Sequence, residues 1–111
     1  NLTLKSFGQT TYQLGNVSGT PTFNFYNGSV QEMTLIGNIV LGSTTTTGFN
    51  TAGQSMTFII NQNSIGNNAL SSNFLFAGGV RQLSSTPYAI DIMNVFYDGT
   101  NYYASLVKGY Q

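Results

Sequence analysis

The chain has 111 residues, of which 41% are hydrophobic and 14% aromatic, enough to build one packed domain. Only 5% are charged, against about 25% in an ordinary soluble domain, and the net charge is zero. No basic surface for nucleic acid is therefore expected, and no run of about 20 apolar residues predicts a membrane-inserted segment. Without Cys or His, the chain cannot form a Ser-His-Asp or Cys-His catalytic site or a thiolate zinc site.

Strand patterns are frequent along the chain and helix patterns are nearly absent. In chain order, the expected strands cover residues 22–26, 55–62, 73–79, 89–97 and 102–107. Each of the first three places its large apolar side chains on one face, namely Phe23 with Phe25, then Met56, Phe58 and Ile60, then Phe74 with Phe76. Gly and Asn separate the strands at turn spacing. We therefore predict one all-β domain over residues 1–111, an antiparallel β-sandwich of jelly-roll type. Residues 1–20 belong either to this domain or to an extended arm or linker.

The chain is expected to end in a hairpin. Residues 89–97 carry apolar side chains on both faces, with Ile92 and Phe96 on one and Met93 and Val95 on the other. Such a strand is covered on both sides, either because it is central or because a neighbouring subunit packs on it. The Asp98-Gly99 pair then predicts the turn into the last strand.

Asp91 lies between two isoleucines in this strand. A shielded carboxylate must be hydrogen-bonded, so we expect its partners to be backbone amides of a neighbouring turn or the side chain of Arg81. In this interpretation, Asp91 ties the connection 81–88 to the final hairpin and fixes the register of that hairpin.

Candidate chemistry is sparse. Glu32 could form a glycosidase pair with Asp91 or Asp98, but a turn explains Asp98 and a strand face explains Glu32, so we predict no enzyme, no cofactor and no metal site. Tyr102, Tyr103 and Tyr110 could contact a carbohydrate or protein partner. The alternative is that they pack within the hairpin or at a subunit contact.

Several short motifs carry a resemblance to a known family. They are Phe-Ala-Gly-Gly at 76–79, Leu-Ser-Ser-Thr at 83–86, Ile-Asp-Ile at 90–92, Tyr-Asp-Gly-Thr at 97–100 with tyrosines after it, and the upstream runs 34–42 and 52–60. Together they are similar to structural proteins of tailed-bacteriophage virions, notably tail-fibre modules and small capsid-associated proteins. The resemblance covers about residues 22–110, and Phe76 stands where family members often carry a tryptophan.

The resemblance implies a non-catalytic β-sandwich on the surface of the virion, commonly a trimer. Its partners would be copies of itself, other virion proteins and, for some members, a host surface glycan or protein. Two roles stay open, a receptor-contacting tail-fibre module and a capsid decoration (cement) protein. The start at Asn1 favours the first, in which the chain is expected to be a piece of a longer protein. A third interpretation, from another class, is a carbohydrate-binding domain, which needs a cleft lined by Tyr or Asn.

Overall fold

The computed structural model describes residues 10–110, and strands dominate this part of the chain. The predicted all-β class is therefore confirmed. The strands are β1 (Tyr12–Gly19), β2 (Phe23–Asn24), β3 (Val30–Val40), β4 (Thr46–Thr47), β5 (Ser55–Gln62), β6 (Leu70–Ser71), β7 (Leu75–Phe76), β8 (Ile90–Tyr97) and β9 (Tyr102–Tyr110). Two single-turn 3-10 helices, η1 (Phe25–Asn27) and η2 (Ala77–Gly79), follow β2 and β7.

The main sheet is mixed rather than antiparallel. Its strand order is β1-β3-β5-β8-β9-β7, with β6 pairing to the end of β3. The pairs β1–β3, β3–β5 and β7–β9 are parallel, whereas β5–β8 and β8–β9 are antiparallel. The predicted antiparallel sheet is thus wrong for three of these pairs, and a jelly roll, which is built from antiparallel Greek keys, is not confirmed.

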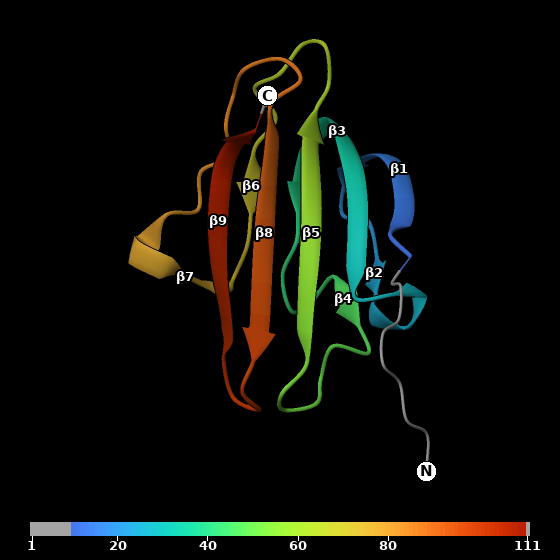
Figure 1. Ribbon diagram of the computed structural model, residues 1–111, viewed down its shortest axis with the longest axis vertical. Helices are drawn as coiled ribbons and strands as arrows, with labels where there is room; N and C mark the ends of the chain where they lie inside the picture. Colours follow the sequence, from blue (N-terminus) through green and yellow to red (C-terminus); the bar gives the residue numbers. More distant parts are fainter. Residues whose placement is uncertain (1–9, 111) are drawn as a thin grey trace, which may run out of the picture.

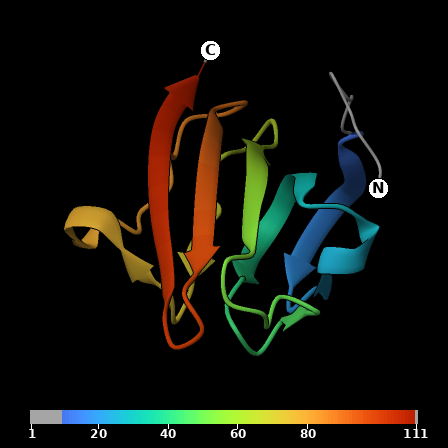
Figure 2. The same ribbon diagram turned by 60° about the horizontal axis from the view of Figure 1, so that its bottom comes forward.

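Parallel neighbours need a crossover, and in most proteins a helix supplies it. Here, the segments between β1 and β3 and between β3 and β5 cross behind the sheet and contain β2, η1 and β4 instead. Strands β2 and β4 pair with each other as a small second sheet. Figures 1 and 2 show the short strands in a layer behind the long strands β3, β5, β8 and β9.

The core lies between the main sheet and this second layer. Strand β5 buries Met56, Phe58 and Ile60 as its alternation predicts. From the second layer, Phe23 meets Phe58 edge to face, with ring centroids 5.6 Å apart. Further buried side chains come from β3, β8, the crossing segments and the loop between β6 and β7, including Met33, Leu35, Phe49, Phe74, Met93 and Val95.

Two predicted strands are shorter than expected. Segment 22–26 is a strand only at Phe23–Asn24, because the Asn24 side chain accepts a hydrogen bond from the amide of Tyr26 (2.9 Å) and starts η1. Segment 73–79 is a strand only at Leu75–Phe76, after which Gly78 turns the chain with a φ of 63°. The expected inward positions of Phe74 and Phe76 hold, since both are buried.

The start of the chain takes part in the sheet. Residues Tyr12–Gly19, within the segment considered as an arm, form β1 and pair with β3. Residues 1–9 and 111 lie outside the described residues.

The predicted terminal hairpin is present as β8 and β9, which pair antiparallel through the 98–101 turn. Strand β8 is central in order, between β5 and β9. Met93 and Val95 face the core, but Phe96 on the opposite face is 44% exposed. Within the described chain, β8 is therefore covered on one face only.

Candidate functional site

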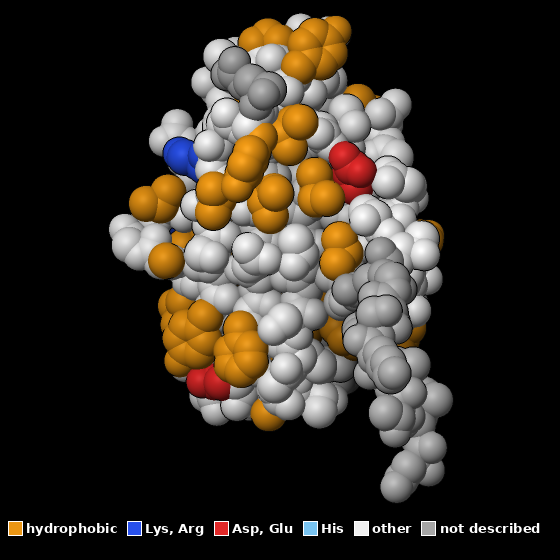
Figure 3. Space-filling view, viewed as in Figure 1, with side chains coloured by type: hydrophobic (Ala, Val, Ile, Leu, Met, Phe, Trp, Pro, Cys, Tyr) orange, Lys and Arg blue, Asp and Glu red, His pale blue; other side chains and the backbone are white. Residues whose placement is uncertain are grey.

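The uncovered side of β5, β8 and β9 forms what we call the open face. Strand register places Ile59, Ile92 and Val107 in one row and Phe96 beside Tyr103 in another. Between these rows lies a polar row of Thr57, Asn94 and Ser105, in which the Thr57 hydroxyl donates to Asn94 Oδ1 (2.9 Å). Figure 3 shows the same arrangement, with two groups of hydrophobic side chains separated by a polar band.

Charge is nearly absent from this side of the sheet. Glu32 of β3, beside Ile59, is the one charged side chain in these rows. Its two carboxylate oxygens accept from the side-chain amides of Gln13 (3.1 Å) and Asn61 (3.0 Å). Apart from Glu32, the open face could therefore be covered without removing an ion from water.

A groove lies at the end of the sheet where β5 ends and β8 begins. Its volume is about 620 Å³, and it is lined by Glu32, Thr34, Asn61, Gln62, Asn63, Ser64, Tyr88 and Ile90. A second hollow of about 520 Å³, lined by Thr86, Pro87, Tyr88 and Ile90, adjoins it. Tyr88 thus stands between two hollows, with its side chain 69% exposed.

The backbone at Tyr88 is unusual. The amide of Ala89 donates to the carbonyl of Thr86 (3.2 Å), which closes a turn with Pro87 second and Tyr88 third. Tyr88 has a φ of 62°. A turn with Pro second and positive φ third is the type II pattern, and its third residue is ordinarily Gly. Placing a tyrosine there costs about 1–2 kcal/mol of backbone strain.

Hydrogen bonds to the neighbouring loop 63–68 hold this turn in place. The amide of Tyr88 donates to the carbonyl of Asn63 (3.1 Å), and the amide of Asn67 donates to that of Ser85 (2.8 Å). The buried Gln62 side chain donates to the carbonyls of Asn68 (2.8 Å) and Ser84 (2.9 Å). The loops before β6 and before β8 therefore form one hydrogen-bonded unit that presents the Tyr88 ring.

Sequence reasoning did not find this groove. Tyr88 is not among the candidate tyrosines, and Glu32 is predicted to be the charge on a strand face, with a glycosidase pair as the alternative. Pro87 does signal a turn, but no sequence pattern favours Tyr at its third position.

Asp91 lies on the core face of β8 and is only 2% exposed. The amide of Ser84 donates to its Oδ2 (2.7 Å), and the amide of Gly109 donates to its Oδ1 (2.9 Å). Ser84 belongs to the connection 81–88 and Gly109 to β9. The hydrogen-bond partners of Asp91 are therefore backbone amides, and not the side chain of Arg81.

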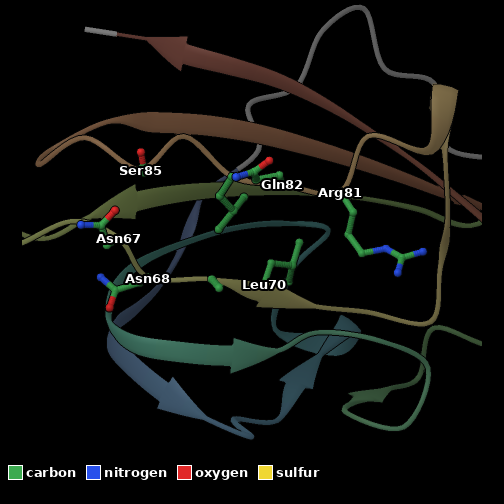
Figure 4. Close-up of a pocket in the computed structure, with 8 residues that line it drawn as sticks. Asn67, Asn68, Leu70, Arg81, Gln82 and Ser85 are labelled. Atoms are coloured by element: carbon green, nitrogen blue, oxygen red, sulfur yellow. The ribbon is translucent and has the colours of Figure 1, made fainter.

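Arg81 is placed elsewhere. Its guanidinium carbon lies 5.5 Å from the centre of the Phe76 ring, a cation–π distance. It also lines a cavity of about 360 Å³ between residues 67–70 and 81–85. In Figure 4, Arg81 lies at one end of this cavity and Asn67 and Asn68 at the other, with Leu70 between them.

The turn residues have local roles. Asp98 Oδ1 accepts from the amides of Asn101 (2.7 Å) and Thr100 (2.8 Å), and these bonds hold the pKa of Asp98 below its usual value. Gly99 has a φ of 100°, which a residue with a Cβ rarely adopts. Glu32, Asp91 and Asp98 are not brought together, because Glu32 is on the open side, Asp91 on the core side and Asp98 in the turn at the far end of β8.

The three candidate tyrosines differ in environment. Tyr102 belongs to the core: its ring stacks on Tyr97 with centroids 4.2 Å apart, and its hydroxyl donates to the carbonyl of Phe49. Burial, with a smaller contribution from Tyr97, raises the pKa of Tyr102. Tyr103 and Tyr110 are each 45% exposed. Only these two are therefore free to meet a partner.

Among residues 10–110, no cluster of three or more acidic side chains could hold a metal ion, and no helix is long and apolar enough to cross a membrane. No protein-family model matches the sequence, no curated protein matches it, and no solved structure matches the fold.

Proposed function

We propose that the chain is a non-catalytic structural module of a bacteriophage particle, of the receptor-contacting tail-fibre type, whose copies associate through the part of the open face that carries Phe96 and Tyr103. The phage assignment is supported by the motifs from residue 76 to 103 and the upstream runs. For the fold, we propose a sandwich in which the β2–β4 layer is the second sheet.

The observation that carries the association is the two-sided apolar pattern of β8. Its core side is covered by the chain, whereas Phe96 on the other side remains 44% exposed. A neighbouring subunit supplies the missing cover. A second copy suits this role because the face has almost no charge, so two copies neither repel each other nor bury an unpaired ion.

The outer edge of β9 also favours association. β9 pairs with β7 only at Tyr103 and Ala104. In the part of the chain that the structure describes, no strand pairs with the outer edge of residues 105–110. The charged side chain on this edge, Lys108, donates to the carbonyl of Gln82 (3.0 Å). An unpaired strand edge invites pairing with another chain unless a subunit covers it. We propose the trimer that the resemblance implies as the state that covers both features.

The groove at Tyr88 favours the tail-fibre role over the decoration role. A receptor-contacting part needs an exposed site for a ligand, whereas a cement protein needs only contacts to its shell. The groove is exposed, and it lies at the opposite end of the sheet from Phe96 and Tyr103. Association through that opposite end leaves the groove accessible.

The association is tested by sedimentation velocity at high micromolar concentration. We expect an oligomer for the unaltered protein, a shift toward monomer for Phe96→Lys, and no shift for the control Tyr26→Lys. Tyr26 is 76% exposed on η1, away from the open face, so the control adds the same charge to another aromatic position. A stable monomer of the unaltered protein, or an equal effect of both variants, contradicts the proposal.

The virion role is tested by mass spectrometry of purified phage particles. Trypsin cleaves after Arg81 and Lys108, which releases residues 82–108 as one peptide. Its presence in the particles is expected. Particles that lack this peptide, from cells that express the protein, count against the role.

A further inference from the structure

We propose that the groove beside Tyr88 binds an uncharged sugar unit of a surface glycan. This inference deepens the receptor-contacting role and rests on it. It names the ligand class and the residues: Tyr88 as the platform, with Glu32, Thr34 and Ser64 as hydrogen-bonding groups.

The backbone of Tyr88 adopts a conformation that favours Gly. Gly would fit the third position of the Thr86–Ala89 turn without strain, yet the chain has a tyrosine there with a φ of 62°. The ring gains little from packing, since the side chain is 69% exposed. Stability therefore does not explain this residue. Strained backbone that presents an exposed side chain is typical of binding sites.

The groups around the Tyr88 ring match the chemistry of a sugar. A sugar ring has apolar C–H faces and hydroxyls at its rim, so it needs a flat apolar surface together with hydrogen-bonding groups. Tyr88 and Ile90 supply the apolar surface. The hydroxyls of Thr34 and Ser64 line the same groove and make no hydrogen bond within residues 10–110. They can both donate to and accept from sugar hydroxyls.

The carboxylate of Glu32 lines the same groove. The Gln13 and Asn61 side chains each donate one hydrogen bond to it, and Asn61 also donates to the carbonyl of Met33 (2.9 Å). These bonds fix the carboxylate and leave acceptor positions on its oxygens. A carboxylate accepting from sugar hydroxyls gives strong, charge-assisted bonds.

Charge selects the ligand class. No Lys or Arg lines the groove, and its single charge is negative, so an acidic sugar would be repelled. The free hydroxyls need partners that both donate and accept, which a neutral sugar supplies and a simple cation does not. The volume of about 620 Å³ lies within the range of sites for small ligands, about 300–1,000 Å³.

The test is a glycan array with neutral and sialylated glycans, followed by calorimetric titration of the strongest neutral ligand. We expect binding to neutral glycans. Tyr88→Gly should weaken it about tenfold or more, because the stacking surface is lost. Glu32→Gln should weaken it about three- to tenfold, and Tyr26→Ala should leave it unchanged.

Thermal unfolding of the same variants separates a binding role from a structural one. Tyr88→Gly should melt at or above the temperature of the unaltered protein, since Gly suits the turn. A lower melting temperature for Tyr88→Gly with retained binding overturns the proposal. Binding to no neutral glycan, or to sialylated glycans only, overturns it as well. An oligomer that binds no glycan refutes the sugar site and leaves the proposed association intact. A monomer that binds a glycan refutes the association and leaves the sugar site intact.

Discussion

Replacing Asp91 by Ala should destabilise the domain far more than any surface change. The substitution removes both acceptors of the amides of Ser84 and Gly109, at a position only 2% exposed. A hydrogen bond to a charged group contributes about 1.5–3 kcal/mol, and a buried donor left without a partner costs a similar amount. Two such losses give an expected destabilisation of about 3–5 kcal/mol, a large share of the 5–15 kcal/mol typical of a domain.

The assay is urea unfolding at one fixed protein concentration. With a slope of about 1.5 kcal/mol per molar urea for a chain of this size, the midpoint of Asp91→Ala should fall by roughly 2–3 M. Asp98→Ala is the matched control. The Asp98 carboxylate also accepts from two backbone amides, but it lies in an exposed turn where water can replace it.

Asp91→Asn is a milder test of the same interaction. The amide keeps one acceptor oxygen and presents its NH₂ group to the other backbone donor, so about half the effect is expected. If Asp91→Ala shifts the midpoint no more than Asp98→Ala does, the two hydrogen bonds contribute nothing to stability and the reasoning fails.

Two further predictions concern the loops and the aromatic core. Gly66→Ala should lower the free energy of unfolding by about 2–4 kcal/mol, because a Cβ there would lie 2.4 Å from the carbonyl oxygen of Ser85. The control Gly53→Ala, also at positive φ but with open space around it, should lower it by only about 1 kcal/mol. Equal urea midpoints for the two variants would contradict the role of crowding at Gly66. Tyr102→Phe should lower the free energy of unfolding by about 1–2 kcal/mol, since the carbonyl of Phe49 loses its donor; calorimetry that finds no loss would assign the contribution of Tyr102 to ring stacking alone.

Local patterns predicted what depends on local chemistry. The alternation in Ser55–Gln62 identified both β5 and its buried face, and the Asp98-Gly99 pair identified the terminal hairpin. In each case the period of the side chains or a turn residue acts within a few neighbours. The same reasoning failed at Phe25, where the capping side chain of Asn24 ended the strand early.

Strand order could not be read from the same patterns. Alternation tells which face of a strand is buried, but it does not say which strand lies beside it or in which direction. The parallel pairs β1–β3 and β3–β5 result from crossovers without helices. Such crossovers give no sequence signal comparable to that of a βαβ helix.

The turn at Tyr88 was missed for a different reason. Sequence rules place Gly at the third position of such a turn, so a tyrosine after Pro87 argues against the geometry that the chain adopts. The loops held together by Gln62 and Gly66 impose that geometry from outside the turn. A conflict between local preference and tertiary structure is expected at functional sites.

Asp91 connects the two proposed surfaces. Through Ser84 it holds the connection that ends in the Pro87–Tyr88 turn, and through Gly109 it holds β9, which carries Tyr103. Weakening these two hydrogen bonds should therefore disturb both the Tyr88 groove and the open face. In Asp91→Asn, which we expect to remain folded, weaker glycan binding should accompany weaker association, whereas Asp98→Ala should change neither. If Asp91→Asn loses only one of the two properties, the surfaces are held independently and Asp91 acts on one of them alone.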